Sequence, residues 1–219
     1  TETITYTVSD GTLTDETGTF TITVTAVNDA PVAVENTLTV DEDAALTSTD
    51  VIANDTDVES DTLTLTAAST DGTGTVAVNE DGLSVDYTPA ADFNGTETIT
   101  YTVSDGTLTD ETGTLTITVT AVNDAPVAVA NTLTVDEDAA ITNTDVIVND
   151  TDVDGDTLSL TAVTTAGTGT VAVNADGLSV DYTPAANFNG TETITYTVSD
   201  GTLTDETGTL TITVTAVND

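Results

Sequence analysis

The chain has 219 residues, of which 39 are Asp or Glu and none is Lys, Arg or His, so its formal charge at neutral pH is −39. No basic side chain can neutralise these carboxylates, and their repulsion opposes folding unless cations from solution balance the charge. Such a surface repels phosphates, which excludes nucleic acid and direct contact with anionic membranes. The absence of Cys excludes disulfides and thiol chemistry. No apolar run approaches the about 20 residues of a membrane span.

The sequence repeats with a period of 95 residues. Residues 30–124 are followed directly by residues 125–219, which copy them with twelve substitutions. Residues 1–29 match the end of each copy, except that Phe20 stands where the copies have Leu115 and Leu210. Arrays of one unit are typical of proteins selected for length, spacing or number of sites. The repeat therefore argues against a single active site.

Alternation of apolar residues with Thr predicts β-strands buried on one side. Disorder, the other interpretation of an acidic and aromatic-poor chain, is disfavoured by this regularity. Turn signals such as Asp81-Gly82, Asn94-Gly95 and Ser104-Asp105-Gly106 separate the strands. In one repeat the expected strands are 32–40, 45–53, 62–67, 73–78, 83–88, 96–103 and 114–121.

Seven short strands in about 95 residues predict an all-β fold, an antiparallel seven-strand Greek-key β-sandwich of immunoglobulin-like type. Tandem sandwiches of this kind would be joined end to end, with a core of aliphatic residues together with Tyr87, Phe93 and Tyr101. At the junction, Pro126 favours an extended backbone and so a short, straight link.

The domain boundaries have two solutions. In one, sandwiches occupy 30–124 and 125–219, and residues 1–29 are the C-terminal strand pair of a preceding repeat. In the other, shifted or split units occupy 1–95, 96–190 and 191–219. An isolated hairpin is only marginally stable in water, and the sequence leaves both frames open.

The acidic residues gather in clusters that recur in each repeat. The first repeat contains Asp41-Glu42-Asp43, Asn54-Asp-Thr-Asp-Val-Glu-Ser-Asp61 and the junction pair Asn28-Asp29. Clusters that offer only oxygen ligands suit a hard cation such as Ca²⁺, whereas softer metals favour the His and Cys that are absent here. Solvated acidic turns are the simpler explanation for any one cluster, but the recurrence favours calcium.

Several motifs together resemble a known family. They are Tyr101-Thr-Val-Ser-Asp-Gly106, Thr116-Ile-Thr-Val-Thr-Ala-Val-Asn-Asp-Ala-Pro126, Asp136-Glu-Asp138 and Asn149-Asp-Thr-Asp-Val-Asp-Gly-Asp156. With the 95-residue period, they look like the cadherin-like repeats in the extender regions of large bacterial RTX-type adhesins. The resemblance implies an extracellular, calcium-stiffened rod at the bacterial cell surface, exported by type I secretion, that supports adhesion and biofilm formation. The distal adhesion ligand would not touch these repeats.

The resemblance also implies which residues bind calcium where successive repeats meet. For the first junction these are Asn28, Asp29, Asp57, Glu59 and Asp105. For the second they are Glu42 from the upstream repeat with Asn123, Asp124, Asp152, Asp154 and Asp200. The match has gaps, because Ala121 and Ala125 replace two linker ligands and Asp92-Phe-Asn94 lacks the Glu of the cadherin motif. We therefore expect one or two ions at each junction, with a weakened or reshaped site where Glu59-Ser60 replaces Asp154-Gly155.

Three functional classes follow. The first is a structural spacer whose partners are calcium ions and neighbouring repeats of the same chain. The second is a repeat that itself binds a carbohydrate or protein, which the lack of Trp disfavours. The third is a hydrolase, for which a nucleophile–base pair is lacking, so we expect no enzymatic activity.

Overall fold

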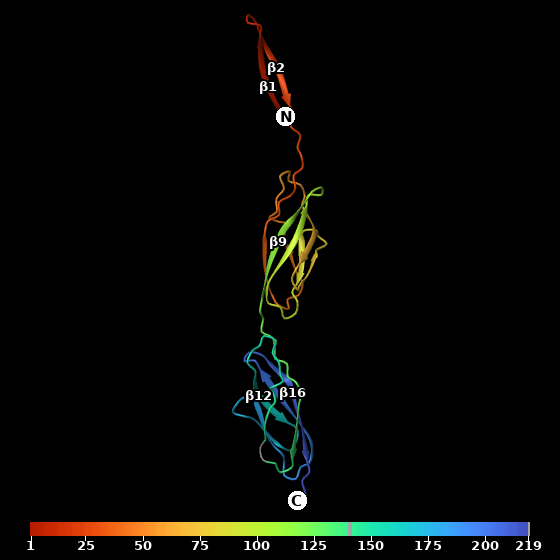
Figure 1. Cartoon of the computed structure of the whole chain (residues 1–219), viewed down its shortest axis with the longest axis vertical. Coiled ribbons are helices and arrows are strands. Elements are labelled where there is room, and N and C mark those ends of the chain that lie inside the picture. The colour runs from red at the N-terminus through yellow and green to blue at the C-terminus, as the bar shows by residue number, and fades with distance from the viewer. Residues whose placement is uncertain (140–141, 219) are drawn as a thin grey trace. The chain divides into compact units, whose positions relative to one another are not determined.

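The computed structural model describes residues 1–139 and 142–218 (Figure 1). These residues form strands joined by turns and loops, without a helix among them. In this part of the chain no helix is therefore long and apolar enough to cross a membrane. The chain divides into two compact units, Thr1–Thr120 and Ala121–Asp219.

The first unit contains a hairpin and a sandwich. The hairpin is a separate two-stranded sheet of β1 (Glu2–Ser9) and β2 (Thr14–Ile22). The sandwich has a four-stranded sheet, in the order β3-β9-β8-β5, and a three-stranded sheet, in the order β4-β7-β6. Its strands are β3 (Asn36–Asp41), β4 (Thr47–Asp50), β5 (Thr64–Thr70), β6 (Thr75–Val78), β7 (Ser84–Thr88), β8 (Gly95–Ser104) and β9 (Thr109–Thr120).

The second unit repeats this sandwich. Its sheets have the orders β10-β16-β15-β12 and β11-β14-β13. The strands are β10 (Asn131–Asp136), β11 (Thr142–Asp145), β12 (Ser159–Thr165), β13 (Thr170–Val173), β14 (Ser179–Thr183), β15 (Gly190–Ser199) and β16 (Thr204–Thr215). The predicted all-β class with tandem seven-strand sandwiches is confirmed.

One pairing corrects the prediction of a purely antiparallel sandwich. β3 pairs with β9 in parallel, with Asn36 opposite Leu115 and Asp41 opposite Thr120. β10 pairs with β16 in the same way. The reason is the strand count: six successive reversals of the chain leave the seventh strand running in the direction of the first, and both lie in the same sheet.

The predicted strand 45–53 is too long, because the structure has only β4, Thr47–Asp50. The Asp50 carboxylate ends the strand by accepting hydrogen bonds from the backbone N–H groups of Ile52 at 3.0 Å and Ala53 at 3.1 Å. Side chains such as Asp compete with the sheet ladder in this way, and hydrophobic alternation alone does not reveal it.

The core lies between the two sheets and depends on a close contact between a tyrosine and a glycine. Tyr101 is only 1% exposed and packs with Tyr87 in the core, while Phe93 packs at its margin. An added Cβ on Gly113 would lie 2.3 Å from the Tyr101 ring. Only glycine leaves room for the ring at this position.

A buried carboxylate also belongs to this core. Glu97 is 4% exposed and accepts hydrogen bonds from Thr73 N at 2.5 Å, Gly74 N at 3.1 Å and the Tyr87 hydroxyl at 2.9 Å. Burial by itself raises the pKa of Glu97, but these hydrogen bonds outweigh it and the net pKa is lowered. Glu192 has the equivalent contacts in the second unit.

Replacing Glu97 by Gln is expected to destabilise the first unit by about 1.5–3 kcal/mol, the usual worth of hydrogen bonds to a charged group. Because folding lowers the pKa of Glu97, its carboxylate stabilises the protein above the unfolded-state value of about 4.3 and loses that contribution as the pH falls further. Urea unfolding across pH should therefore show the gap between wild type and E97Q narrowing below about pH 4. Glu80→Gln changes the same charge at an exposed position and should have little effect. Equal losses in E97Q and E80Q would contradict this account.

Candidate metal centre

The linker that precedes the first sandwich contains the junction pair Asn28-Asp29 and is hydrogen-bonded to acidic loops of the first unit. The Asn28 side-chain amide donates to Asp105 Oδ2 at 2.6 Å and to Thr107 Oγ1 at 3.0 Å. The backbone N–H of Asp29 donates to Glu59 Oε2 at 3.2 Å. Four of the five residues predicted for this junction, all but Asp57, are thus in direct contact.

The turn at Ser104-Asp105-Gly106 explains how Asp105 reaches the linker. Its Oδ1 accepts hydrogen bonds from the backbone N–H groups of Thr107 at 2.6 Å and Leu108 at 2.7 Å, which leaves Oδ2 for the linker. Gly106 has φ +98°, a conformation that glycine adopts without steric cost. These backbone hydrogen bonds, followed by that from Asn28, hold the pKa of Asp105 well below its usual range.

The second unit has the equivalent contacts from its linker Asn side chain and Asp backbone. Asn123 Nδ2 donates to Asp200 Oδ2 at 2.7 Å. The backbone N–H of Asp124 donates to Asp154 Oδ2 at 2.8 Å, compared with 3.2 Å for the corresponding contact with Glu59. The Asn123 amide is the main reason why the pKa of Asp200 is strongly lowered.

Ser60 and its counterpart Gly155 have the same left-handed backbone conformation. Ser60 has φ 63° and its counterpart Gly155 has φ 78°. This left-handed conformation is unfavourable for a residue with a Cβ. The first loop therefore carries a strain that the second avoids.

Asp57 and Asp152 lie on these same loops, two residues before Glu59 and Asp154. One oxygen of each carboxylate accepts a backbone N–H, from Asp61 at 2.9 Å and from Asp156 at 3.1 Å. The Oδ2 atoms of Asp57 and Asp152 are buried and have no hydrogen-bond partner. A buried oxygen without a donor is costly, and a cation is one way to satisfy it.

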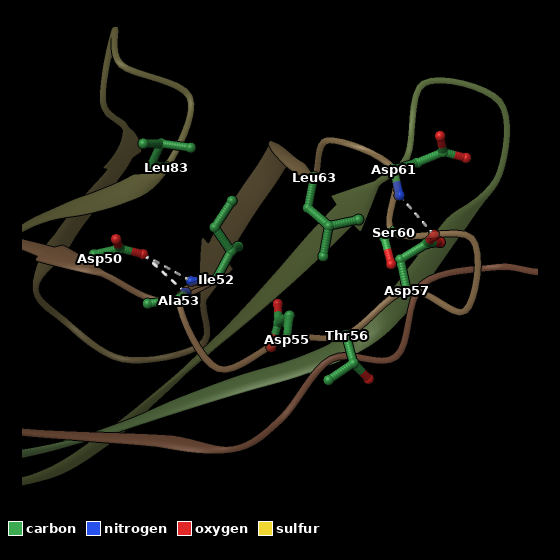
Figure 2. A pocket seen from close by; sticks show the side chains of 10 residues that line it. All are labelled: Asp50, Ile52, Ala53, Asp55, Thr56, Asp57, Ser60, Asp61, Leu63 and Leu83. Carbon is green, nitrogen blue, oxygen red and sulfur yellow. Dashed lines mark hydrogen bonds between the residues drawn. The ribbon is translucent and has the colours of Figure 1, made fainter.

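The loop that carries Asp57 also borders an acidic pocket of about 500 Å³ (Figure 2). Its lining includes Asp50, Asp55, Asp57 and Asp61. Asp55 Oδ1 accepts the backbone N–H of Val34 at 2.7 Å, while its buried Oδ2 has no hydrogen-bond partner. Burial, and to a smaller extent the neighbouring carboxylates, raise the pKa of Asp55.

The structure places the predicted ligand Glu42 at the end of its sandwich, with 4% exposure. Its backbone N–H donates to Thr120 O at 2.9 Å, and its Oε2 accepts the Asn94 amide at 3.4 Å. Glu42 is thus held by the strand that leads into the second linker.

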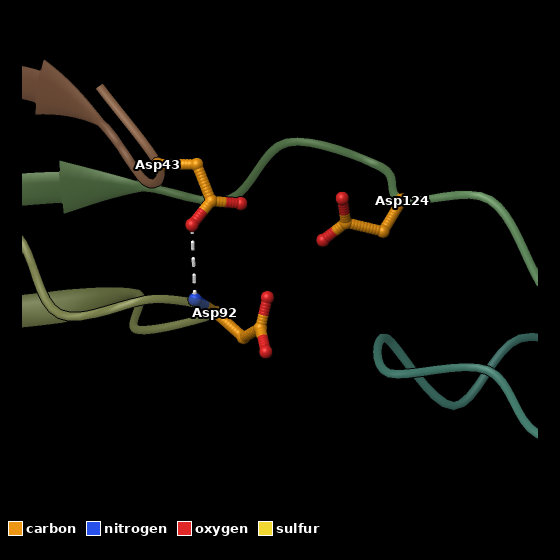
Figure 3. A group of neighbouring side chains, drawn as sticks. All are labelled: Asp43, Asp92 and Asp124. Carbon is orange, nitrogen blue, oxygen red and sulfur yellow. Dashed lines mark hydrogen bonds between the residues drawn. The ribbon is translucent and has the colours of Figure 1, made fainter. Parts of the chain in front are cut away.

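Sequence reasoning missed two residues close to Glu42. The Asp92 backbone N–H donates to Asp43 Oδ1 at 3.2 Å, and Asp43, Asp92 and Asp124 each offer an oxygen within 4.8 Å of the others (Figure 3). Among the side chains that the structure describes, this is the one group of three carboxylates that meets this spacing, and the predicted set Asp57, Glu59 and Asp105 does not.

The signal for Asp43 was present, since it belongs to the acidic cluster Asp41-Glu42-Asp43. Asp92 stands alone in the sequence, in the segment judged to lack its metal-binding Glu, so no pattern pointed to it. Both residues have positive φ, 56° for Asp43 and 55° for Asp92, which only the fold reveals. Asn187 replaces Asp92 in the second repeat, so this carboxylate is specific to the first.

Tandem seven-strand sandwiches with acidic loops define an immunoglobulin-like and cadherin-like repeat protein. The chain belongs to the bacterial Ig domain family, which matches residues 28–118 and 123–213. No curated protein sequence matches the chain.

Solved structures support the fold. A human mucin-like protocadherin EC1-2 structure aligns with TM-score 0.50 and 18% identity over 85% of this chain and 98% of its own. The human CDH23 EC21-23 structure aligns with TM-score 0.51 and 18% identity over 87% and 71%. Endo-fucoidan hydrolases of glycoside hydrolase family 107 also match, but at TM-score 0.35 and 20% identity they carry no argument; this chain spans about a third of their length, 34%.

The turn of the β1–β2 hairpin gives an internal reference for the linker contact. Asp10 has the same turn as Asp105, with bonds from the backbone N–H groups of Thr12 and Leu13, and its pKa is lowered to about 2. The pKa of Asp105 lies lower still, and only Asp105 accepts a bond from Asn28.

Asn28→Ala should therefore raise the pKa of Asp105 to about that of Asp10, because the lost amide N–H stabilises the ionised carboxylate. Carboxyl NMR titration without divalent ions would measure this. Asp200, bound by Asn123, serves as the control and should titrate as in the wild type. An unchanged pKa for Asp105 would mean that Asn28 does not hold it in solution.

Proposed function

We propose that the chain is an extender segment of a cell-surface adhesin, in which calcium bound at the linkers makes the array rod-like. The rod projects a distal ligand-binding domain for adhesion and biofilm formation. The observation that carries this proposal is that each linker Asn-Asp pair is hydrogen-bonded to carboxylates at equivalent positions of the acidic loops in both repeats. Tandem immunoglobulin-like and cadherin-like repeats fit a structural or adhesion-related role.

The donor set fits calcium. It consists of carboxylate and amide oxygens, which a hard cation with 6–8 ligands requires. The residues that would hold the ion at the first linker are Asn28, Asp29, Asp57, Glu59 and Asp105. At the second they are Glu42, Asn123, Asp124, Asp152, Asp154 and Asp200, and we add Asp43 and Asp92 from the structure.

The buried Oδ2 atoms of Asp57 and Asp152 give the strongest support for an ion. With 39 acidic and no basic side chains, the chain has no internal countercharge to offer them. An ion that binds only the folded state stabilises it by about 2.7 kcal/mol at 100 times its Kd. A bound calcium ion would therefore both stabilise the repeat and restrain its linker.

We further propose that the protein works outside a bacterial cell, at the surface, after type I secretion as in the RTX-type adhesins it resembles. Extracellular calcium modules bind with Kd values of about 10⁻⁴–10⁻³ M. Loops built from exposed carboxylates and a few buried oxygens suit this weak range.

A repeat that binds a ligand itself is less well supported. Each sandwich has a small hollow between β5 and β8 or between β12 and β15, of about 240 and 230 Å³. Both volumes fall below the about 300–1,000 Å³ typical of ligand sites. The lining is Thr, Ser, Ala, Val and the edge of a core Tyr, without Trp or a cationic side chain. The acidic pocket of about 500 Å³ lies within that range, but its carboxylates suit a cation, so these repeats are better suited to spacing than to recognition of a carbohydrate or protein.

Calcium should raise the melting temperature of the chain. Chelation should lower it and increase the flexibility of the chain in small-angle scattering.

Asp152→Asn provides the sharper test, because an Asn oxygen can still accept the Asp156 N–H while the buried negative charge is removed. We expect D152N to keep or slightly raise the metal-free stability of the second unit and to lose most of its calcium-dependent gain in calorimetry.

The matched control is Glu80→Gln, which removes one exposed charge outside the proposed sites and should respond to calcium like the wild type. Scattering profiles and melting curves that are identical with calcium and with chelator would rule out the calcium-stiffened rod. An unchanged calcium response in D152N would remove Asp152 from the site.

A further inference from the structure

The β1–β2 hairpin exposes an apolar face. Its residues are Ile4, Tyr6, Val8, Phe20 and Ile22, with exposures of 50%, 51%, 57%, 58% and 36%. The same positions of β8 and β9 are Ile99, Tyr101, Val103, Leu115 and Ile117, none of which is more than 1% exposed. Apart from Phe20 in place of Leu115, the same residues therefore occur in two environments, and they are exposed in the hairpin.

The hairpin already has the conformation it needs inside a sandwich. Glu2 pairs with Ile22 as Glu97 pairs with Ile117, and the register shifts at Tyr6/Val8 as it does at Tyr101/Val103. The ring of Tyr6 lies over Gly18, where an added Cβ would be 2.4 Å away, as the ring of Tyr101 lies over Gly113. Binding would require little rearrangement of the hairpin.

The chain itself shows what covers this face. The five strands β3 to β7 supply the remaining core around β8 and β9, with β3 parallel to β9 and β5 antiparallel to β8. Val85 and Tyr87 of β7 close the core from the opposite sheet. In the hairpin, by contrast, the two strands pair only with each other, as a separate two-stranded sheet.

We propose that the apolar face of β1–β2 is a docking site for a five-strand segment with the sequence of residues 30–94. The segment would add its first strand parallel to β2 and its third strand antiparallel to β1, completing a seven-strand sandwich. Its Asn at the position of Asn36 would donate to the Tyr6 hydroxyl, as Asn36 Nδ2 donates to the Tyr101 hydroxyl at 3.0 Å. This inference does not depend on the proposed calcium role.

Glu2 distinguishes this occupant from a second copy of the hairpin. Glu2 lies on the same face as Ile4 and Tyr6 and corresponds to Glu97, whose carboxylate needs the donors of Thr73, Gly74 and Tyr87. A five-strand segment brings these donors with it. Two hairpins packed face to face would instead bury two Glu2 carboxylates without a donor or a cationic partner, which is unfavourable.

The test mixes the full chain with a labelled segment of residues 30–94 and measures binding by sedimentation, with and without calcium. We expect a 1:1 complex in both conditions. Ile4→Asp should weaken binding at least tenfold, whereas Thr5→Asp, which adds the same charge on the opposite face, should leave it unchanged. Equal binding by wild type and I4D would overturn the proposal, because the segment would then be displacing β8–β9 or binding elsewhere.

A second measurement covers the case in which the free segment aggregates. The sequence of residues 30–94 is fused ahead of Thr1, and amide exchange of β1–β2 is compared with that of the unfused chain. Peptides of β2 that contain Phe20 differ in mass from those of β9 and β16, which carry Leu, so they report on the hairpin alone. We expect exchange in the hairpin to slow at least tenfold in the fusion, and not in its I4D variant.

Unchanged exchange in the fusion would overturn the proposal. A dimer formed by the full chain alone and dissociated by I4D would also overturn it, in favour of a second copy as the occupant. If docking occurs but calcium changes neither melting nor scattering, the docking site stands and the proposed calcium role fails.

Discussion

The structure depends on how a chain without cationic side chains accommodates its carboxylates. The donors come from the backbone and from neutral side chains. Glu97 is held by Thr73, Gly74 and Tyr87, and Asp105 by its own turn and by Asn28. Asp50 is held by the backbone N–H groups of Ile52 and Ala53. Each such bond fixes a backbone segment, so the acids shape the loops. Where donors are lacking, as at Asp57 Oδ2 and Asp152 Oδ2, the fold leaves oxygens suited to an external cation.

The sequence was sufficient for the fold class because Thr and apolar residues alternate within the strand segments, and the 95-residue period set the repeating unit. It also located most of the acidic loops, since their carboxylates are consecutive or alternate along the chain. It was not sufficient for Asp92, which approaches Asp43 only through tertiary structure. Alternation places Glu97 on the same face as Ile99, but it does not show that Thr73, Gly74 and Tyr87 supply the donors that its carboxylate needs. The hydrophobic pattern also does not show strand ends that are set by side-chain hydrogen bonds, such as the end of β4 at Asp50.

The two copies differ in the acidic loops that contact their linkers, so their linker contacts can be compared within one chain. In the first copy, Glu59 Oε2 accepts the backbone N–H of Asp29 at 3.2 Å, next to the strained residue Ser60. In the second, Asp154 Oδ2 accepts the backbone N–H of Asp124 at 2.8 Å, next to Gly155. Asp92 in the first copy becomes Asn187 in the second, so one carboxylate is lost there. The core sequence from residue 93 onward is unchanged between copies. Variation is therefore concentrated in loops and at outward positions, and Ala68/Val163 at the margin of the core is an exception.

The parallel pairing of the first and last strands has a mechanical consequence. β3 follows the entry of the chain into the sandwich and β9 leads out of it, and the two lie side by side from Asn36/Leu115 to Asp41/Thr120. Tension applied through the two ends of this sandwich pulls these strands past each other along their length. Their interstrand hydrogen bonds are then loaded together in shear, whereas strands pulled apart from one end would lose them one at a time. Forced unfolding is governed by the unfolding rate and not by equilibrium stability, so this single pair of strands determines how long a stretched repeat stays folded.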